Sequence, residues 1–304
     1  MTLPAGAETS AATQWTVQGL LDWATQFFAK QGIESPHLEA EMLLAYALGC
    51  KRIELYLRYA TVVDETGRAR FKEAVVRRTR HEPVAYITGT RAFYSLEFKV
   101  TPDVLIPRPE TETLVETALS ILADLKETGP VLRLVDVGTG SGNIPVSLAK
   151  FLPALSVLGI DVSEKALVIA SENAERLGVS ERCLFRKGSL LEPLSDYPAF
   201  EKPDLITANL PYVTQRDYDA LPAGIKQFEP ASALLGGVDG LQYIIGLIPQ
   251  AGAHLLSGRF LLLEIGAGQA ALLQAMDFSQ AGMRLIRFDR DLAGIQRVAV
   301  YQKV

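Results

Sequence analysis

A regular alternation of strand-like and helix-like segments from residue 131 onward constrains the fold more than any other feature. Apolar segments with the length of buried strands occur at 131–137, 155–161, 183–187, 204–208 and 259–265. Segments with helical periodicity occur at 143–151, 163–177, 241–256 and 269–276. This order predicts an α/β fold, a mostly parallel sheet with helices on both faces. Two final strands, near 283–288 and 296–301, are joined by a short connection without a helix, so we expect an antiparallel hairpin at one edge of the sheet.

The segment before this region has a different pattern. From Thr16 to about His81 the apolar residues recur at helical spacing, which predicts a small helical bundle. Between Val84 and Val100 the apolar residues alternate around Gly89, which predicts a short β-hairpin. We therefore expect a disordered tail over residues 1–15, an N-terminal helical domain over 16–82, a hairpin connector over 83–104 and an α/β domain over 105–304.

Composition excludes several classes of protein. The chain has 304 residues, of which 48% are hydrophobic and 21% charged, so it can bury a sizeable core and is neither disordered nor fibrous. No apolar run reaches the length of a membrane span, and residues 1–13 lack the Lys and Arg of a signal peptide. The two cysteines, Cys50 and Cys183, have no partners at metal-binding spacing. These features predict a cytoplasmic protein without a membrane segment, disulfide or metal site.

The charge balance bears on possible partners. The formal net charge is −5, and the first 104 residues are neutral. A protein whose main partner is duplex nucleic acid is usually basic, so we expect no direct nucleic-acid binding. One basic cluster, Lys72, Arg77, Arg78 and Arg80, followed by Arg91, has two interpretations: a solvated helix face or a contact for RNA phosphates.

A glycine-rich turn follows the strand expected at 131–137. The segment reads Gly138-Thr139-Gly140-Ser141-Gly142 and leads into a helix. Glycines let the backbone turn sharply and approach a ligand closely, and the helix start offers free N–H groups, which favours a nucleotide-like cofactor. A tight turn without a ligand would use the same residues. Asn143 stands where a dinucleotide fingerprint has its third glycine, which disfavours NAD.

An acidic residue, Asp161, ends the next expected strand. It lies 23 residues after Gly138, where a carboxylate accepts hydrogen bonds from both hydroxyls of a ribose. An acid at this position equally suits the cap of the following helix. Both interpretations stay open from the sequence.

A second motif, Asn209-Leu210-Pro211-Tyr212, follows the strand expected at 204–208. Ligands of open α/β folds bind at such strand ends. Asn209 offers a side-chain carbonyl, and Pro211 restricts Leu210 to an extended conformation that fixes the direction of its backbone carbonyl. Two convergent acceptors hold both hydrogens of a planar NH₂ group, and Tyr212 provides an aromatic wall. Because the lone pair of such a nitrogen is delocalised, the chemistry requires orientation and desolvation rather than a general base.

These residues together resemble a seven-stranded, Rossmann-like methyltransferase that depends on S-adenosylmethionine and acts on a planar NH₂. Other motifs extend the resemblance from about residue 16 to the end, to the HemK-type protein glutamine methyltransferases. They are Pro83-Val-Ala-Tyr-Ile-Thr-Gly89, Leu105-Ile-Pro-Arg-Pro-Glu-Thr-Glu112, Phe228-Glu-Pro230, Gly236-Gly-Val-Asp-Gly-Leu241, Glu264-Ile-Gly266 with Gln269, and Asp291-Leu-Ala-Gly-Ile295 with Arg297.

The resemblance implies methylation of the glutamine side-chain nitrogen, N5, in the Gly-Gly-Gln motif of class-one peptide chain release factors. In this family the small N-terminal domain contacts the release factor. The resemblance further implies a cytoplasmic monomer acting in translation termination. By position, residues 138–142 would surround the methionine part of the cofactor, Asp161 would hold its ribose and Leu190 would lie by the adenine. Asn209 would be the catalytic residue and would also lie beside the cofactor. Together with the Leu210 carbonyl, it would bind the glutamine amide. Pro211 and Tyr212 would shape the slot for this amide.

Two departures keep alternatives open. Leu210 stands where the family usually has the first proline of Asn-Pro-Pro-Tyr, and the resulting Asn-Leu-Pro-Tyr also resembles the loop of ribosomal RNA adenine-N6 dimethyltransferases. Ser189 stands where an acidic residue is common near the adenine. The alternatives are a glutamine methyltransferase for ribosomal protein L three, an adenine-N6 nucleic-acid methyltransferase, and a binding module that has lost catalysis. Arg108 and Glu110 either order the loop over the cofactor or pair with each other.

Overall fold

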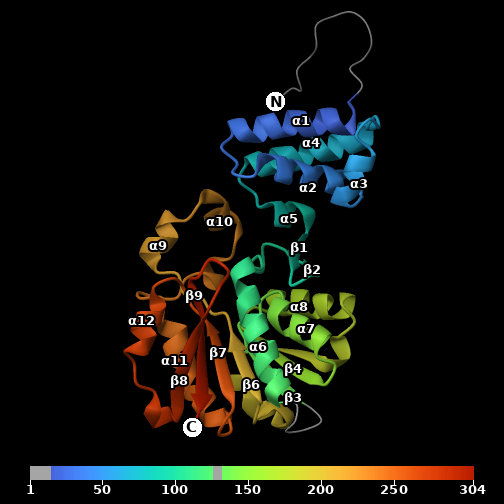
Figure 1. Cartoon of the computed structure of the whole chain (residues 1–304). Helices are drawn as coiled ribbons and strands as arrows, with labels where there is room; N and C mark the ends of the chain where they lie inside the picture. The colour runs from blue at the N-terminus through green and yellow to red at the C-terminus, as the bar shows by residue number, and fades with distance from the viewer. Residues whose placement is uncertain (1–14, 126–131) are drawn as a thin grey trace, which may run out of the picture. The chain divides into compact units, whose positions relative to one another are not determined.

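The structure is a computed structural model that describes residues 15–125 and 132–304 (Figure 1). Its internal contacts divide the chain into two compact units, and the boundary along the chain falls between Thr88 and Gly89. The expected disordered tail, apart from Trp15, and Val131 of the first expected strand lie outside the described residues. Each unit is described by itself.

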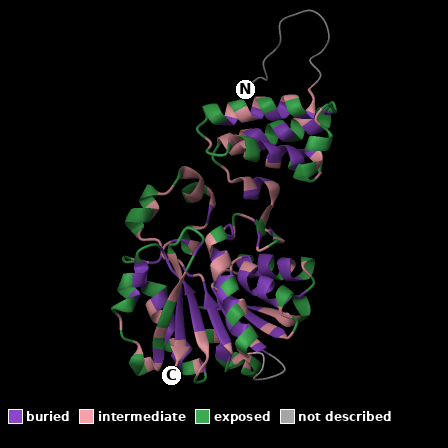
Figure 2. Ribbon diagram, in the orientation of Figure 1, coloured by how far each residue is buried: buried purple, intermediate pink, exposed green. Residues whose placement is uncertain are grey.

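The N-terminal unit is helical, as the periodicity predicts. Its helices are α1 (Val17–Lys30), α2 (Pro36–Leu48), α3 (Arg52–Leu57), α4 (Glu65–Thr79) and α5 (Val84–Thr88). Thr16 begins α1 by accepting a hydrogen bond from the Gly19 backbone N–H at 3.1 Å, and Asp64 begins α4 by accepting one from Gly67 at 2.7 Å. The apolar faces meet in one core that includes fully buried Phe28 and Phe71. Figure 2 shows buried stretches along the helices of this unit. Burial of these faces stabilises the bundle.

One part of the predicted hairpin is wrong. Residues 84–88 form α5, and only the segments after it are strands, β1 (Thr90–Phe93) and β2 (Leu96–Lys99), paired antiparallel. Pro83 precedes the helix and accepts hydrogen bonds from the Tyr86 and Ile87 backbone, while Gly89, at φ +75°, ends it. A short apolar run is ambiguous between helix and strand, and these flanking residues resolve it.

Two arginines of the basic cluster pair with acids of the N-terminal unit itself. Arg77 Nε lies 2.8 Å from Glu82, and Arg78 Nε lies 2.5 Å from Glu39. These ion pairs neutralise part of the positive charge that a phosphate contact would require. The charges of Arg77 and Arg78 are therefore balanced within the N-terminal unit.

The C-terminal unit contains the predicted α/β fold. Its strands after the hairpin are β3 (Leu132–Val137), β4 (Leu155–Asp161), β5 (Cys183–Lys187), β6 (Leu205–Ala208), β7 (Phe260–Glu264), β8 (Met283–Arg290) and β9 (Gln296–Lys303). Its helices are α6 (Glu112–Leu125), α7 (Asn143–Phe151), α8 (Glu164–Arg176), α9 (Gln215–Ala220), α10 (Ala223–Phe228), α11 (Gln242–His254) and α12 (Gln269–Gln274).

These strands form one seven-stranded sheet in the order β5-β4-β3-β6-β7-β9-β8 (Figure 1). The five strands from β3 to β7 pair in parallel, whereas β9 is antiparallel to both β7 and β8. The predicted antiparallel hairpin at the sheet edge is therefore confirmed. Because β3, β4, β6 and β7 run the same way, their carboxyl ends meet at one edge, where loops converge.

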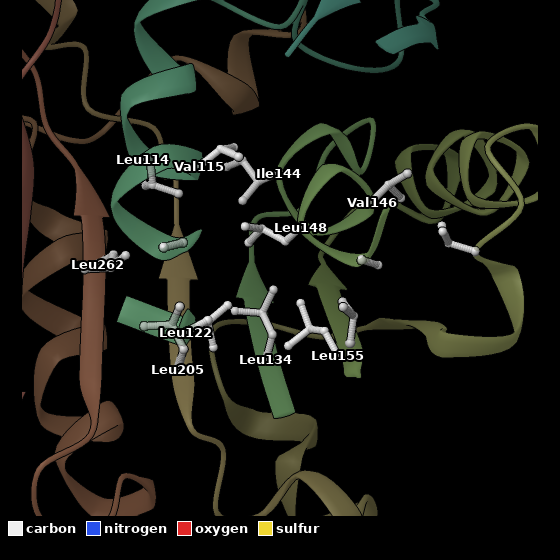
Figure 3. Close-up of a cluster of buried hydrophobic side chains, with 14 of the residues drawn as sticks. Leu114, Val115, Leu122, Leu134, Ile144, Val146, Leu148, Leu155, Leu205 and Leu262 are labelled. Carbon is white, nitrogen blue, oxygen red and sulfur yellow. The ribbon is translucent and has the colours of Figure 1, made fainter. Parts of the chain in front are cut away.

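Alternation along the central strands builds two apolar layers. Leu134 of β3 packs on the face covered by α6, α7 and α8, and its neighbour Val135 packs on the face covered by α11 and α12. Figure 3 shows the first layer, where Leu122 of α6 and Leu148 of α7 lie over the sheet beside Leu134. Both layers consist of buried apolar side chains, whose packing positions the strands. Among the described residues, no helix has the length and apolar character needed to cross a bilayer.

Candidate active site

A cavity of about 330 Å³ lies in the C-terminal unit at the carboxyl ends of β3, β4 and β6. Ligand pockets of α/β folds occur at this position and have this size. The lining comes from segments 102–105, 107–108, 137–141, 143–144, 161–163, 188–190, 209–211 and 232–233, with Thr111, Ala166, Pro230 and Tyr243. Nine of the eleven residues expected from the sequence are among them; Gly142 and Tyr212 are not.

The glycine turn forms one wall of the cavity. Gly138, Gly140 and Gly142 have φ values of +72°, +54° and +77°, a region that side chains rarely adopt. The backbone N–H groups of Gly138 and Thr139 donate to Ile160 O at 2.8 and 3.1 Å, which ties the turn to the end of β4. The three glycines are thus required by backbone conformation before any ligand is considered.

Gly142 serves helix packing. It is the N-cap of α7, and a Cβ at this position would lie 3.1 Å from the Cβ of Ala170 in α8. The missing side chain lets the two helices approach closely. This contact explains why Gly142 lies behind the cavity wall.

Asp161 holds the turn and the following helix together. Its Oδ2 accepts from the Gly140 N–H and its Oδ1 from the Ser163 N–H, each at 2.9 Å. Ser163 itself caps α8 through its side chain, so Asp161 is not the cap residue. Burial raises the pKa of Asp161, and these backbone hydrogen bonds partly offset the rise. Each oxygen keeps a further lone pair, and the residue lines the cavity.

A fully buried acid, Asp136, lies on β3 two residues before the glycine turn. None of the sequence motifs includes this residue in a role, although an acid inside an apolar strand is itself a signal. Its Oδ1 accepts a hydrogen bond from Thr207 Oγ1 at 2.6 Å. Burial raises the pKa of Asp136 to about 7, and the hydrogen bond from Thr207 partly offsets the effect.

We expect Asp136→Asn to stabilise the protein increasingly as pH rises. The pKa of Asp136 is higher in the folded protein than in the unfolded chain, so the folded protein keeps a proton that the unfolded chain loses above about pH 4. The free energy of unfolding of the wild type therefore falls between about pH 4 and about pH 7. Asparagine removes this loss and still accepts from Thr207. Urea unfolding should show a stability gain about 2 kcal/mol larger at pH 8 than at pH 5. A variant less stable than wild type at pH 8 would contradict the assignment.

Leu190 lies on the far side of the cavity in a strained conformation. Its φ is +51°, unusual for a residue with a branched side chain. The next residue, Leu191, donates its backbone N–H to Gln250 Oε1 at 3.1 Å, which helps to hold the loop. Strain of this kind persists where surrounding contacts enforce it, and it occurs preferentially at functional sites. Leu190 thereby presents an apolar surface to the cavity.

The Asn209–Tyr212 segment forms the opposite wall. Asn209 Nδ2 donates to Thr111 Oγ1 at 3.2 Å, and the Leu210 side chain is buried near Gly138. No hydrogen bond within the described residues uses the Leu210 carbonyl, which is therefore free to accept one. Tyr212 lies behind this wall against Gly266, and burial raises the pKa of its hydroxyl.

The backbone after Pro211 is fixed by Gln269. Gln269 Oε1 accepts from the Gly266 N–H at 2.8 Å, and Nε2 donates to Gly240 O at 3.1 Å and to Tyr212 O at 3.4 Å. One buried amide thus joins the ends of β6 and β7 to the loop before α11. The sequence motif contained Gln269, but only the fold shows what it connects.

An ion pair holds two segments that line the cavity. Arg108 Nη2 lies 2.6 Å from Glu229 Oε1, and Glu229 Oε2 accepts from the Ile106 backbone at 3.2 Å. The alternative in which Arg108 pairs with Glu110 is wrong, because the chain brings buried Glu229 to the arginine instead. Arg108 therefore orders the 105–108 loop against the segment before Pro230.

A third buried acid, Glu264, ends β7 beside Asn209. The register pairs Ala208 with Leu263, so Asn209 and Glu264 leave neighbouring strands together. Burial raises the pKa of Glu264 to about 7, and the neighbouring Thr111 and Asn209 side chains and the charge of Arg297 partly offset the rise. The sequence motif contained this residue too, without a role.

The fold and this cavity define an α/β methyltransferase. A family model described as a methyltransferase domain matches residues 130–233, and one described as the PrmC N-terminal domain matches residues 19–89. Two solved structures of the hMettl16 catalytic domain, each with a MAT2A 3'UTR hairpin, have TM-scores of 0.53 and 0.52 at 16% and 17% identity. They cover 79% and 74% of this chain and 81% of each solved chain, and they show the fold alone.

Full-length relatives identify the family. Release factor glutamine methyltransferases from Rhodopirellula baltica, Geobacter sulfurreducens and Nitratidesulfovibrio vulgaris are 42%, 40% and 39% identical. The matches cover 98%, 93% and 96% of this chain and 99%, 95% and 95% of the relatives. The chain belongs to the release factor glutamine methyltransferase family.

Metal-binding side chains do not gather in the part of the chain that the structure describes. No group of three or more His, Cys, Asp or Glu residues is placed there to hold an ion. Cys50 and Cys183 are both free thiols.

Proposed function

We propose that this protein transfers a methyl group from S-adenosylmethionine to the side-chain amide nitrogen, N5, of the glutamine in the Gly-Gly-Gln motif of class-one release factors. The observation that carries the proposal is the placement of Asn209. Its amide nitrogen donates to the Thr111 hydroxyl, which leaves its carbonyl oxygen for a substrate NH₂. Membership of the family supports the choice of glutamine as the acceptor.

The residues of the cavity fit the cofactor. Asp161 keeps lone pairs for two vicinal hydroxyls, Leu190 offers an apolar surface for a flat ring, and the turn at Gly138 and Gly140 lets backbone approach the methionine part. Thr139 and Ser141 complete this wall. Free N–H groups at the start of α7 suit a carboxylate. When bound, S-adenosylmethionine supplies an electrophilic methyl group on a positively charged sulfur.

The acceptor nitrogen is held by two oxygens. Asn209 Oδ1 and the Leu210 carbonyl accept the two amide hydrogens, and Pro211 keeps the latter in place. These bonds would fix the plane of the amide so that the nitrogen faces the methyl group. The bound cofactor would supply the methyl group to this nitrogen and keep the sulfur as a neutral thioether, and the nitrogen would lose one of the two N–H protons that Asn209 Oδ1 and the Leu210 carbonyl hold. No general base is required.

The domain roles extend this proposal. The helical region over residues 16–82 recognises the release factor, and the 83–104 region connects it to the catalytic domain over 105–304. The enzyme acts as a monomer in the cytoplasm and has no direct nucleic-acid contact. Ion pairing of Arg77 and Arg78 within the N-terminal unit supports the last point.

Methyl transfer with a labelled cofactor tests the proposal. Purified protein is incubated with release factor, ribosomal protein L three and total RNA in separate reactions, and the label is located by mass spectrometry of the fragments. We expect label on the glutamine of the Gly-Gly-Gln motif. Label only in the ribosomal protein or only in RNA would replace the proposed substrate, and cofactor binding without transfer would favour the binding module.

A further inference from the structure

The carboxyl group of Glu264 is buried without an obvious role in the fold. The residue is 1% exposed at the end of β7, and its Oε2 has no hydrogen-bond partner within the described residues. A buried acid without complete partners costs free energy, and a glutamine or leucine of similar shape would avoid that cost. Such a group therefore needs an explanation other than stability.

The neighbours of Glu264 supply the explanation. Thr111 and Asn209 are the neighbouring polar side chains that act on the carboxyl group, Asn209 follows the strand paired with that of Glu264, and the Asn209 nitrogen donates to the Thr111 oxygen at 3.2 Å. One acid thus faces the donor side of the Asn209 amide and the hydroxyl that contacts it. Glu264 itself does not line the cavity, whereas Asn209 and Thr111 do.

An asparagine amide has two nearly symmetric orientations. With the nitrogen turned toward the cavity, Asn209 would present donors to a substrate NH₂ and repel it. A negative charge behind the amide favours the orientation in which the nitrogen faces inward and the oxygen faces the cavity. The strength of this preference depends on the charge, because a neutral amide in place of the carboxylate has both a donor and an acceptor.

We propose that Glu264 is a positioning residue that holds the Asn209 amide with its oxygen toward the substrate, through direct contact and through the Thr111 hydroxyl. Glu264 touches neither substrate nor cofactor. The inference rests on the proposed function, in that the acceptor is a planar NH₂ group, but not on which molecule carries that group.

Glu264→Gln tests the proposal with the shape of the side chain preserved. We expect kcat to fall about 10- to 100-fold, because misorientation of a positioning group has effects of this size. The cofactor Kd and the KM for the protein substrate should stay within about threefold, and the melting temperature should not fall. Glu181→Gln, at an exposed site before β5, is the matched control and should leave all four quantities unchanged.

The pH profile distinguishes positioning from a structural role. Glu264 is faced by Arg297 from β9, by Glu110 and Thr111 from the segment before α6, and by Asn209 and Tyr212 from the loop after β6. Because the pKa of Glu264 is about 7, wild-type kcat should rise as pH increases through this value and the carboxylate forms. The Glu264→Gln profile should lack that rise, whereas any contribution from Asp136 would remain in both proteins.

Thr111 provides a second pair of variants if Glu264→Gln fails to fold. Thr111→Val removes the hydroxyl and should lower kcat about tenfold, and Thr111→Ser should recover at least half of that loss. Wild-type kcat in Glu264→Gln, an unchanged pH profile, or equal activities of the two Thr111 variants would overturn the proposal.

A substrate-free measurement separates this inference from the proposed function. The side-chain ¹⁵N–¹H signals of Asn209, assigned by comparison with Asn209→Asp, should shift in wild type as pH passes about 7 and stay fixed in Glu264→Gln. Unchanged signals in both proteins would refute the inference whatever acceptor is methylated. If the wild type methylates RNA or a ribosomal protein instead of the release factor, the proposed function fails, and the same variants are compared on that acceptor.

Discussion

We expect Asn209→Ala to lower kcat for methyl transfer by about 10²- to 10³-fold, while the Kd for S-adenosylmethionine changes by less than about fivefold. Removal of one well-placed polar group from a reaction centre has effects of this size. Alanine deletes the side-chain acceptor for the substrate NH₂ and leaves the glycine turn, Asp161 and Leu190 in place. Single-turnover kinetics with labelled cofactor, together with equilibrium binding, separate the two quantities.

Asn209→Asp sharpens this test, because it keeps the shape of the side chain, an acceptor oxygen at Oδ1 and the Leu210 carbonyl. It removes the donor to Thr111 and places a second acid beside Glu264. Like charges at this distance repel or share a proton, so we expect Asn209→Asp to be inactive near neutral pH as well. Unchanged turnover in Asn209→Ala would refute the orientation mechanism.

The second large effect is expected from Gly240→Ala. A Cβ on Gly240 would lie 2.2 Å from the Tyr212 carbonyl oxygen, and the residue has φ +72°. The clash is with backbone, so the loop after β6 must shift, and Gln269 cannot keep its hydrogen bonds to both carbonyls. We expect a loss of about 3 kcal/mol in stability and at least a tenfold fall in kcat/KM.

Gly258→Ala is the matched control for this prediction. Gly258 has φ +83°, but a Cβ there would meet nothing within 4 Å. It should therefore cost only the strain of a left-handed alanine, about 1–2 kcal/mol, and leave kcat/KM unchanged. Equal losses of stability and activity in the two variants would show that backbone strain, not the contact with Tyr212, limits the loop.

Much of the fold followed from periodicity. Apolar strands of buried length, separated by amphipathic helices, have few ways to bury their surfaces, so the parallel sheet and its antiparallel edge hairpin could be predicted. The exception was the segment at 84–88, where a short apolar run fits helix and strand equally and the flanking Pro83 and Gly89 decided between them.

The cavity residues were predictable for a related reason. Glycines at 138 and 140, Asp161 and Asn209 follow strands that end at the same edge, and chain order alone brings such positions together. Gly142 and Tyr212 belong to the same motifs but lie behind the wall, since motif spacing does not tell which side of a turn faces the cavity.

The sequence by itself determined the class of fold, the edge of the sheet that carries the cavity and most of the residues that line it, because each depends on local pattern and chain order. Only the tertiary structure decided the partners of the buried acids: Asp136 with Thr207, Glu229 with Arg108, and Glu264 beside Asn209. The physical reason is that a pKa or an ion pair depends on burial and on residues more than 50 positions away, which no local pattern contains.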